Sequence, residues 1–367
     1  MGLASDVPAK PDSGTGLLPE VFLSGPDAAA GERDPRRPRD QFRRSAWSWL
    51  VSITVAAVLL YAALRDIDWR RVRDLIVGAR WSFLAASGLT SCASYFLRSV
   101  RWRILLNAEG HFTVGTVFSA NMAGYVGNNF LPARAGELIR TFLISSQSSL
   151  SKTYVLTTAL AERMMDAVAL VLWGSVVLLG VNPKPGWLES VSWSTTLIAS
   201  AGVLAVFILP RTAGLCENLI RRVPMPHSIR ERLLHLAGQI LAGLRVFHDP
   251  GRLARFALLT AAVWGIDAAG VMIGGSAFRL NITYPMAALL LCGLGLGSAV
   301  APTPGYVGTF QSVAVAVLTP FGLSREAAIA FILVVQALGY LVVLLLGLPP
   351  ILRYRGLRGR TRIPTPP

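Results

Sequence analysis

The sequence has few of the side chains that carry enzyme chemistry. Its 367 residues include three cysteines and four histidines, and only 15% of the residues are charged. Cys92, Cys216 and Cys292 are isolated, so they provide neither metal-ligand spacing nor a disulfide framework. The histidines also lack ligand spacing, and no H-E-x-x-H, G-x-S-x-G or Walker motif occurs. We therefore expect a protein that is not an enzyme and that uses no metal or cofactor.

A signal peptide is also missing, because no early basic patch leads directly into an apolar core. Residues 1–45 are rich in Pro, Gly, Asp and Arg and show almost no apolar periodicity, which predicts a disordered tail. The arginine-rich run 33–44 within it suits an anionic lipid surface on the cytoplasmic side. Binding of this run to nucleic acid is the less favoured alternative.

Long apolar runs dominate the rest of the chain, which is 53% hydrophobic with a mean hydropathy of +0.52. A membrane-spanning helix needs about 20 mostly apolar residues. Runs of this length, or nearly so, are 47–64, 81–97, 167–181, 194–209, 254–278 and 327–349. The sequence therefore predicts an all-α polytopic membrane protein with about six full spans.

The net charge of +15 comes from 35 Lys and Arg against 20 Asp and Glu. In a soluble protein this excess would indicate a nucleic-acid partner. In a membrane protein, the positive-inside rule and anionic headgroups explain it more simply, and we expect no nucleic-acid partner. The loop predicted after the second run carries Arg98, Arg101 and Arg103, which places that loop on the inner side.

The same rule orients the other segments. The stretch 211–255 and the tail 353–367 are rich in arginine and are predicted to be cytoplasmic, as is the N-terminal tail, in a plasma-membrane protein. The loop 182–193 has one Lys and one Glu and is predicted to lie outside. The loop 65–80 is an exception, because it should face out yet carries five Arg against three Asp. An interfacial helix would account for it.

Two short segments of the chain share one sequence motif. Each places P-x-x-x-G after an apolar stretch, with Pro132 and Gly136 in the first copy and Pro304 and Gly308 in the second. Proline removes a backbone donor and glycine frees the dihedral angles, so each apolar helix should stop at this point. Non-helical backbone at membrane depth is tolerated only where protein or a water-filled cavity covers it. Residues Pro302 and Gly305 are expected to complete the second tip.

Because the arginine-marked segments fix the sides, 114–150 must return to the inner side and 283–320 to the outer side. We therefore predict two re-entrant helical hairpins, one in each half of a membrane region 46–352. The halves, 46–181 and 182–352, both read span, span, hairpin, span with opposite starting sides, which indicates an inverted-topology repeat. An amphipathic cytoplasmic linker is predicted at 211–253, where apolar residues recur at helical spacing among arginines.

The hairpin tips are expected to meet around a small polar cavity. Arg134 and Asn129 would face it from one side, and Thr303 and Gln311 from the other. Arg134, Glu137 and Arg140 lie three residues apart, which stacks them on one helix face. The N-terminus of that helix favours an anion, and arginine offers a planar fork for phosphate.

We therefore predict a lipid-headgroup site formed by Arg134, Glu137 and Arg140 with the pair Asn128 and Asn129. The alternative is an internal salt bridge that holds the hairpin closed.

Glu162, Arg163 and Asp166 form a second charged cluster. They come directly before the apolar run 167–181, which predicts that they lie at the inner start of that span. These residues could pair with Arg134 or Arg140, or carry protons; the alternative is an interfacial cluster at a helix end. Asp267 stands alone in an apolar run, and an acid within the membrane is by default a functional candidate. It could carry a proton or act as neutral hydrogen-bonding glue between helices.

Several of these motifs occur together in one known family. The segments 101–103 (R-W-R), 128–137 (N-N-F-L-P-A-R-A-G-E), 162–166 (E-R-x-x-D) and 302–308 (P-x-P-G-x-x-G) resemble the flippase-like transmembrane domain of lysylphosphatidylglycerol synthases and their stand-alone relatives. The resemblance covers about 45–352 and implies a plasma-membrane protein that moves or handles lipids. The synthases carry a soluble aminoacyl-transferase domain after the membrane region, and this chain ends at Pro367. The resemblance therefore implies transport rather than synthesis. Position 311 departs from it, since many members have an acid near Gln311.

These observations favour a lipid translocase for an anionic or phosphate-bearing lipid, either a phospholipid or a polyprenyl phosphate. The alternative is a scaffold or regulator of lipid- or polyprenol-linked glycosyltransfer that transports nothing itself. An enzyme acting on lipid is disfavoured because the sequence offers no catalytic set.

Overall fold

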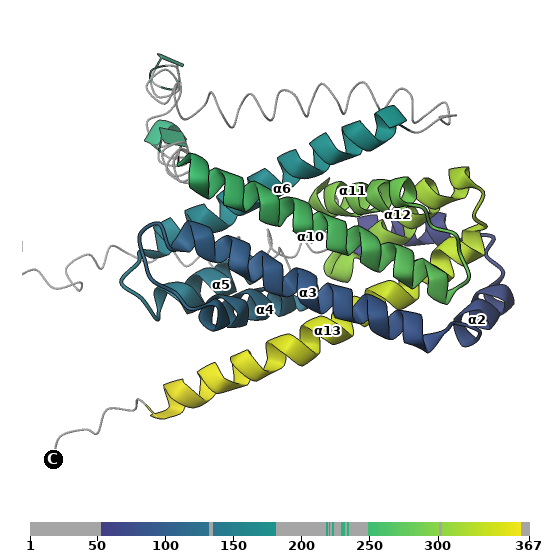
Figure 1. The fold of residues 1–367 in the computed structure, drawn as a ribbon, viewed down its shortest axis with the longest axis horizontal. Coiled ribbons are helices and arrows are strands. Elements are labelled where there is room, and N and C mark those ends of the chain that lie inside the picture. Colours follow the sequence, from purple (N-terminus) through teal and green to yellow (C-terminus); the bar gives the residue numbers. More distant parts are fainter. Residues whose placement is uncertain are drawn as a thin grey trace, which may run out of the picture. The chain divides into compact units, whose positions relative to one another are not determined.

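Helices form nearly all the regular structure of the computed structural model, and no strand occurs among the residues it describes (Figure 1). The described residues are 53–131, 135–180, 218, 220, 222–223, 229–231, 233–234, 249–300 and 303–360. All of them belong to one unit, Trp49–Pro367. Several predicted features lie outside the described residues: the tail 1–45, Pro132, Arg134, Pro302, the loop 182–193, the apolar run 194–209 and most of the linker 211–253.

The described helices follow one another in a simple order. The first runs from Ile53 to Leu64. The others are α2 (Trp69–Val77), α3 (Trp81–Leu106), α4 (Val114–Phe130), α5 (Gly136–Ser145), α6 (Lys152–Gly180), α10 (Pro250–Ala277), α11 (Tyr284–Val300), η4 (Pro304–Tyr306), α12 (Thr309–Leu318), η5 (Thr319–Phe321) and α13 (Arg325–Arg360). The last helix therefore continues into the segment predicted as a basic tail.

Helix α3 is longer than the apolar run that predicted it. It continues to Leu106, so Arg98, Arg101 and Arg103 lie within the helix and not in a loop. The prediction that these arginines mark an inner loop is wrong. The physical reason is that Arg98 and Arg101 are paired with carboxylates of other helices, so their charges do not end the buried segment.

Helix α6 is also longer than predicted. It begins at Lys152, whereas the apolar run began at residue 167. Glu162, Arg163 and Asp166 therefore lie well inside a 29-residue helix, and the prediction that they sit at its start is wrong. The apolar-run criterion missed this half of the helix because it counts charges as interruptions even where they are paired inside the protein.

The first predicted hairpin is present as the antiparallel pair α4 and α5. Leu131 ends α4 in an extended conformation with ψ of 152°, as expected for a residue before proline. The amide of Gly136 donates to Asn128 Oδ1 at 3.0 Å, which satisfies a free N–H at the start of α5. A Cβ on Gly127 would lie only 2.8 Å from Gly136 Cα, so the two helices touch through their backbones.

Gly136 serves a different purpose from the predicted one. It has no left-handed φ, so its role is to permit close packing and not to free a dihedral angle. A Cβ at this position would overlap the carbonyl oxygen of Gly124 on α4. The glycine therefore sets the distance between the two helices of the hairpin.

The second predicted hairpin is present as the antiparallel pair α11 and α12. Gly293 and Gly297 on α11 bring that helix against Val313, since a Cβ on either glycine would lie 2.7 or 3.1 Å from its methyl groups. The turn η4 between them needs positive φ at Gly305 (59°) and at Gly308 (84°). Here the glycines do free the dihedral angles, as the sequence predicted.

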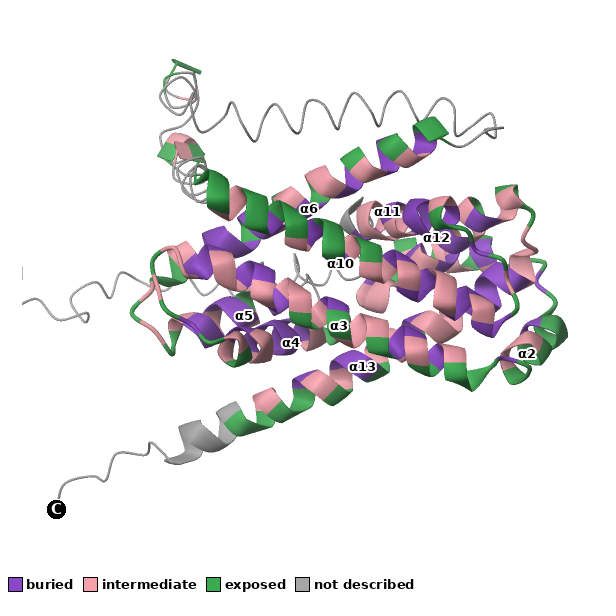
Figure 2. Cartoon of the chain, in the orientation of Figure 1, coloured by how far each residue is buried: buried purple, intermediate pink, exposed green. Residues whose placement is uncertain are grey.

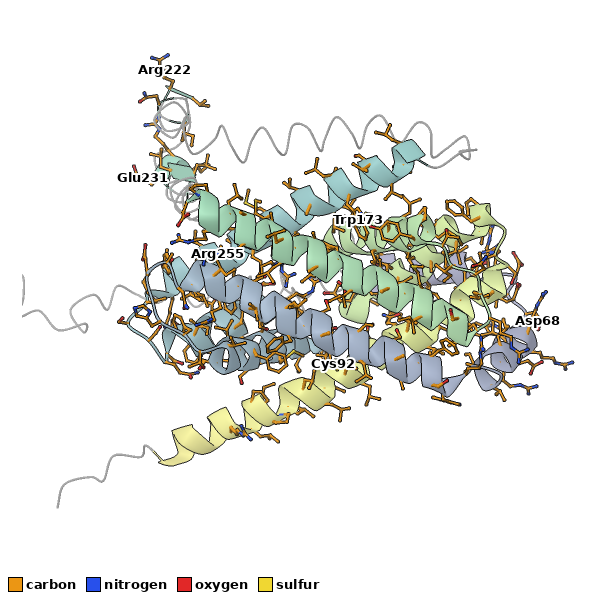
Figure 3. All side chains as sticks on the ribbon, in the orientation of Figure 1. Asp68, Cys92, Trp173, Arg222, Glu231 and Arg255 are labelled. Atoms are coloured by element: carbon orange, nitrogen blue, oxygen red, sulfur yellow. The ribbon has the colours of Figure 1, made fainter. Side chains whose placement is uncertain are left out.

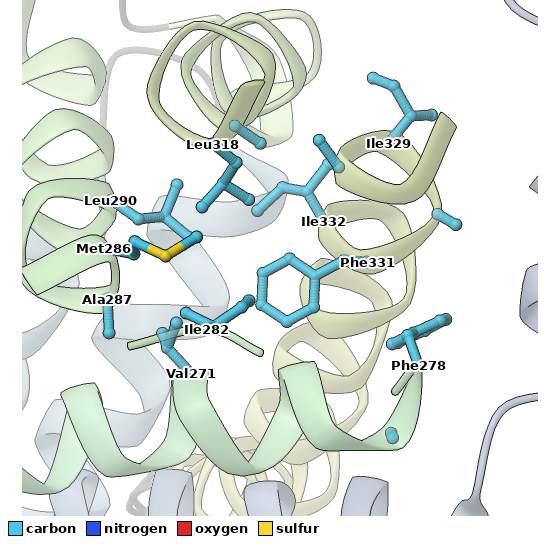
Figure 4. Close-up of a cluster of buried hydrophobic side chains, with 14 of the residues drawn as sticks. Val271, Phe278, Ile282, Met286, Ala287, Leu290, Leu318, Ile329, Phe331 and Ile332 are labelled. Carbon is cyan, nitrogen blue, oxygen red and sulfur yellow. The ribbon is translucent and has the colours of Figure 1, made fainter. Parts of the chain in front are cut away.

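Each hairpin belongs to its own hydrophobic core. One core lies among α3, α4, α5 and α6 and centres on Trp102, with Phe256 of α10. The other lies among α10, α11, α12 and α13 and includes Leu290, Leu318 and Phe331, which point toward one another in Figure 4. The second core also includes Ala63, Val72 and Leu84 from the first helix, α2 and α3, so the two cores do not divide the chain at the predicted boundary between the halves.

The two halves also contact each other reciprocally. Helices α3 and α10 run antiparallel, as the contact of Arg80 with Ala277 at one end and of Arg101 with Thr260 further along requires. Helix α6 packs on α11, where Cys292 Sγ donates to the Leu170 carbonyl at 3.3 Å. Helix α13 packs on α4, where Gly347 lies against Met122. Each half therefore places its last long helix on the first hairpin helix of the other half.

The long helices carry apolar side chains on their outer faces as well as inside. Figure 2 shows buried and exposed residues alternating along α6, α10 and α13. Leu258, Val176 and Leu345 are 71%, 67% and 63% exposed in the isolated chain. Large apolar side chains at this exposure on several helices indicate a surface covered by lipid or by another protein.

Helix α2 occupies the loop whose charge broke the positive-inside pattern. It is a nine-residue helix that begins at the N-cap Asp68, labelled in Figure 3, whose carboxylate accepts from the amide of Arg70 at 2.9 Å. Val72 is its buried residue, and its arginines are on the exposed side. A short amphipathic helix is therefore present where one was predicted; its depth in a membrane stays a prediction.

Gly308 offers a direct test of the second tip. Its φ of 84° disfavours any side chain, and a Cβ there would overlap the Ala56 carbonyl of the first helix. We expect Gly308→Ala to destabilise the protein by about 1–2 kcal/mol from backbone conformation alone, with more from the clash. Thermal unfolding in detergent would measure this. Gly322→Ala is the matched control, because Gly322 also has positive φ (88°) but has open space around it. Equal losses in the two variants would rule out the contact with the first helix.

Candidate functional site

A cavity of about 370 Å³ lies where the two hairpins meet. Its walls come from α3, α4, α5 and α6 of the first half and from α10, α11, η4, α12 and α13 of the second. A Cβ on Gly305 would lie 3.6 Å from the Asn129 carbonyl oxygen, so the two tips are in contact at this cavity. Their predicted proximity is confirmed within the described residues.

The cavity wall has two chemical sides. Polar and charged groups come mainly from the first half and from α10, namely Ser91, Tyr95, Arg98, Tyr125, Asn128, Asn129, Glu137, Arg163 and Asp267. Apolar groups come mainly from the second half, namely Val271, Leu291, Leu294, Phe310, Ile332 and Val335, and this half also contributes the uncharged polar groups Ser298, Tyr306, Gln336 and Tyr340. A ligand that fits such a wall has both a polar and an apolar part.

A balanced network of ion pairs includes the charged groups of the cavity wall and continues into the protein behind them. Its members are Arg98, Arg101, Arg140 and Arg163 with Glu137, Glu162, Asp166 and Asp267. Four positive and four negative groups leave no net charge. Removing charges from water is costly unless they are paired and hydrogen bonded, so this balance is what allows them to be buried together.

Arg101 is the centre of the network, with a side chain that is 0% exposed. Its two terminal nitrogens donate to Asp166 Oδ1 and Oδ2 at 2.6 and 2.9 Å, which is the bidentate geometry that arginine favours. It also donates to Glu162 Oε1 at 3.0 Å and to Thr260 Oγ1 of α10 at 3.1 Å. The guanidinium lies over the Phe256 ring at 4.9 Å. Arg101 therefore ties α3 to α6 and α10.

Arg140 extends the network to the first hairpin. It donates to Glu162 Oε2 at 2.9 Å and to Asn121 Oδ1 at 3.0 Å, and it pairs with Glu137 at 2.5 Å. Its guanidinium lies over the Trp102 ring at 4.5 Å. Arg140 does not line the cavity. The predicted pairing of Glu162 with Arg140 is present, and so is the internal salt bridge that was the alternative to a headgroup site.

Arg98 and Asp267 form the ion pair that joins the two halves at the cavity. Arg98 donates to Asp267 Oδ2 at 2.7 Å and lies 3.8 Å from Asp166 Oδ2. Asp267 is the only acid of its apolar run in the sequence, yet in the folded chain it has an ion-pair partner. The reason is that Arg98, assigned by the sequence to a loop, lies on the facing side of α3. The guanidinium of Arg98 also lies over the Trp264 ring at 4.9 Å.

Arg163 is the most accessible arginine of the network, with 35% of its side chain exposed. Its Nε donates to Glu137 Oε1 at 2.9 Å, and its Nη1 lies 3.9 Å from Asp166. Asn128 lies 3.5 Å from the same carboxylate oxygen of Glu137. Arg163, Glu137 and Asn128 thus form one patch of the cavity wall.

The second tip is held by a chain of side-chain hydrogen bonds. Gln311 Oε1 accepts from the Gly308 amide at 2.8 Å, and its amide donates to Gln336 Oε1 at 2.8 Å. Gln336 and Tyr340 then both bond to the Gly305 carbonyl oxygen. Gln311 is buried and does not face the cavity. The expectation that it would do so is wrong, because its side chain is used to close the turn.

Thr303 behaves in the same way as Gln311. Its hydroxyl lies 3.0 Å from that of Thr309, and it is absent from the cavity wall. The second tip is represented in the wall by Tyr306, whose ring stacks on Phe310 at 5.0 Å. The sequence could not show that Thr303 and Gln311 are turned away from the cavity while Tyr306 lines it, because all three residues lie near the same proline-glycine break.

The structure brings most of the predicted site residues together. Asn128, Asn129, Glu137, Arg163 and Asp267 all line the cavity. The ones it places behind the wall are Arg140, Glu162 and Asp166, whereas Pro304, Gly305, Gly308 and Gly136 shape the two hairpins. The residues that the sequence missed include Arg98, Tyr95 and Trp264. Helical spacing alone gave a signal for Arg98, since it lies three residues before Arg101 on one face.

These features define the class of protein. Three of the described helices are long and apolar enough to cross a membrane: Lys152–Gly180, Pro250–Ala277 and Arg325–Arg353. Two of them, α6 and α10, contribute four charged groups to the ion-pair network, which α3 and α5 complete, and such mutual pairing is what ionisable groups within a membrane require. The aromatic side chains Trp173, labelled in Figure 3, and Tyr284 join α6 to α11 by a hydrogen bond of 2.9 Å. The chain is thus an all-helical membrane protein with a partly polar internal cavity.

The chain belongs to the family described as the lysylphosphatidylglycerol synthase TM region, which matches residues 49–347. This confirms the resemblance predicted from the sequence motifs. The chain is also 22% identical over 322 residues to the glycosyltransferase AglD of Haloferax volcanii, covering 77% of this chain and 50% of that protein. It therefore spans about half the length of this curated relative.

Proposed function

We propose that this protein translocates a phosphate-bearing lipid across the plasma membrane without any covalent chemistry. The lipid headgroup would enter the cavity between the two hairpin tips while its tails stay in the bilayer. The observation that carries this proposal is the cavity itself, with charged groups on one side, apolar groups on the other and both hairpin tips in its wall. Such placement at the contact of two broken helical segments is typical of transporter binding sites.

Matching helix lengths support an inverted repeat. The first half gives α3, α4, α5 and α6 with 26, 17, 10 and 29 residues. The second gives α10, α11 and α12 with 28, 17 and 10 residues, followed by the long α13. Antiparallel packing of α3 on α10 and the reciprocal contacts of α6 and α13 are what a two-fold axis in the membrane plane would produce. We propose that the hairpins are re-entrant and that both termini are cytoplasmic.

Alternating access requires the contact between the halves to change. Of the eight residues in the ion-pair network, only Asp267 belongs to the second half, and its partner Arg98 lines the same cavity. Arg98 has a second carboxylate, Asp166, at 3.8 Å within its own half. We propose that Arg98 moves between these two carboxylates as the halves rearrange, and that a lipid phosphate competes for it.

Reconstitution into lipid vesicles tests the proposal. Purified protein would be incorporated with fluorescent phosphatidylglycerol, phosphatidylcholine or polyprenyl phosphate, and translocation followed by chemical quenching of the outer leaflet. We expect faster exchange of at least one phosphate-bearing lipid than in empty vesicles. We expect Asp267→Asn, which keeps the shape of the side chain, to lower the rate by at least about tenfold, equivalent to about 1.4 kcal/mol in the barrier.

The matched control is Asp74→Asn, which removes a carboxylate from the exposed pair Arg73–Asp74 on α2. This variant should translocate lipid at the wild-type rate, because exposed ion pairs contribute little. If wild-type protein moves none of the probes, or if Asp267→Asn is as active as Asp74→Asn, the proposed mechanism is wrong.

The similarity to the glycosyltransferase AglD favours a second candidate function. Its printed name is that of a glycosyltransferase, and half of its length matches this chain. A membrane scaffold or regulator of lipid- or polyprenol-linked glycosyltransfer would use the same cavity to hold a lipid without moving it. This function requires that reconstituted protein binds polyprenyl phosphate but gives no exchange between leaflets.

A further inference from the structure

A second hollow lies at the end of the bundle away from the ion-pair network. It has a volume of about 750 Å³ and is formed by α2, the connection from α10 to α11, η5 and the start of α13. Figure 1 shows α2 beside the end of α10. Helices α3, α11 and α13 begin near this place and α10 ends there. In a protein whose long helices cross a membrane, such a layer of helix ends lies near the membrane surface.

The polar lining of this groove is positive. Arg71 and Arg279 come from different elements, and Asn281, Thr283 and Ser324 add neutral donors. None of the described residues that line the groove is acidic. This composition favours a ligand that carries negative charge and several acceptor oxygens.

The two arginines differ from those of the central network. There, all four guanidinium groups are paired with carboxylates. Here, within the described part of the chain, neither the Arg71 nor the Arg279 side chain has an ion pair or hydrogen bond. Arg73 on the same helix as Arg71 is paired with Asp74 at 3.0 Å, so the carboxylates of α2 are used elsewhere.

The backbone at Arg279 is a second, independent observation. The helix α10 ends in a Schellman motif, in which the Leu280 amide donates to Gly275 and the Arg279 amide to Ser276 at 3.0 and 3.2 Å. Arg279 holds the left-handed position of this motif, with φ of 57°, where glycine is the usual residue. A non-glycine residue is disfavoured at this φ, so the side chain of Arg279 is present at a cost to stability. Such strain is typical of functional positions.

The floor of the groove is apolar. Leu75, Met286 and Phe321 line the groove together with the two arginines. A free inorganic anion would make no use of such a floor, whereas a lipid would place its phosphate on the arginines and the start of its chain on these side chains.

We propose that this groove is a binding site for the phosphate of an anionic lipid at the membrane surface. The site is separate from the central cavity and does not depend on whether that cavity translocates lipid. It also accounts for the arginine-rich segment 65–80, whose charge does not follow the positive-inside pattern.

The test is a titration of detergent-solubilised full-length protein with short-chain phosphatidylglycerol, followed by native mass spectrometry. We expect Arg71→Gln and Arg279→Gly each to weaken binding by about tenfold, because each removes one charged fork from the phosphate. Arg73→Gln is the matched control and should bind as the wild type does. The wild type and Arg73→Gln should bind phosphatidylcholine more weakly than phosphatidylglycerol. The two groove variants, Arg71→Gln and Arg279→Gly, should bind the two lipids equally.

The stability of Arg279→Gly separates binding from a structural role. Because glycine suits the left-handed position, its apparent melting temperature in lipid-free detergent should rise by about 2–4 °C while binding falls. A fall in both the melting temperature and the lipid binding of Arg279→Gly would mean that Arg279 has a structural role, and would overturn the proposal. So would unchanged binding in both groove variants, or displacement of phosphatidylglycerol by equal concentrations of inorganic phosphate. The vesicle exchange assay is not used here, so the two proposals fail independently.

Discussion

Arg101→Met is expected to be the most destabilising single substitution in the described part of the chain. It removes the cation that faces Glu162 and Asp166 while leaving both carboxylates buried. Removing one partner from a buried ion pair costs about 3–5 kcal/mol, and here the loss of Arg101 leaves four buried carboxylates facing three arginines, with one negative charge uncompensated out of water. We expect a fall of roughly 10 °C in the apparent melting temperature in detergent, or loss of folded protein on expression.

A compensating variant keeps this prediction testable if the single variant does not fold. In Arg101→Met/Glu162→Gln and in Arg101→Met/Asp166→Asn the network again holds three positive and three negative groups, and we expect part of the stability to return in each. Arg73→Met provides the control, because Arg73 is exposed and its pair with Asp74 should contribute no more than about 1 kcal/mol. Wild-type stability in Arg101→Met, with no benefit from the added substitutions, would show that the network does not hold the helices together.

Gly136→Ala is expected to have the next largest effect. A Cβ at residue 136 would overlap the Gly124 carbonyl oxygen and lie 2.5 Å from Asn128 Oδ1. Neither neighbour can yield easily, because one is backbone and the other accepts the Gly136 amide. The helices α4 and α5 would have to separate, with a loss of about 1–3 kcal/mol typical of overpacking and weaker pairing of Arg140 with Asn121.

The control is Gly265→Ala on α10. A Cβ there would meet nothing within 4 Å, so alanine should stabilise the helix by about 0.5–1 kcal/mol. Thermal unfolding of both variants, together with lipid exchange in vesicles, separates a packing effect from a general one. If Gly136→Ala unfolds at the wild-type temperature, the close contact of the hairpin helices is not required.

The ion-pair network explains why the positions of several charged residues could not be predicted correctly from the sequence. Apolar runs end at charged residues, so they predict a span that ends at residue 97 and another that begins at residue 167, whereas α3 continues to Leu106 and α6 begins at Lys152. In the folded chain, the charges of Arg98 on α3 and Asp267 on α10 compensate each other, although the two residues are 169 positions apart in sequence. No local pattern shows such a pairing, because it depends on which helix faces which.

The sequence by itself determined the class of the protein and the places where helices break. Long apolar runs require a membrane, and proline followed by glycine stops a helix, so the membrane class and both helix breaks could be predicted from local chemistry, while the family was predicted from the resemblance of sequence motifs. Tertiary structure alone decided which charged residues face the cavity, which are paired behind it, and that Gln311 closes the second tip. The reason is that backbone breaks are set by neighbours along the chain, whereas the environment of a charge is set by helices brought together in folding.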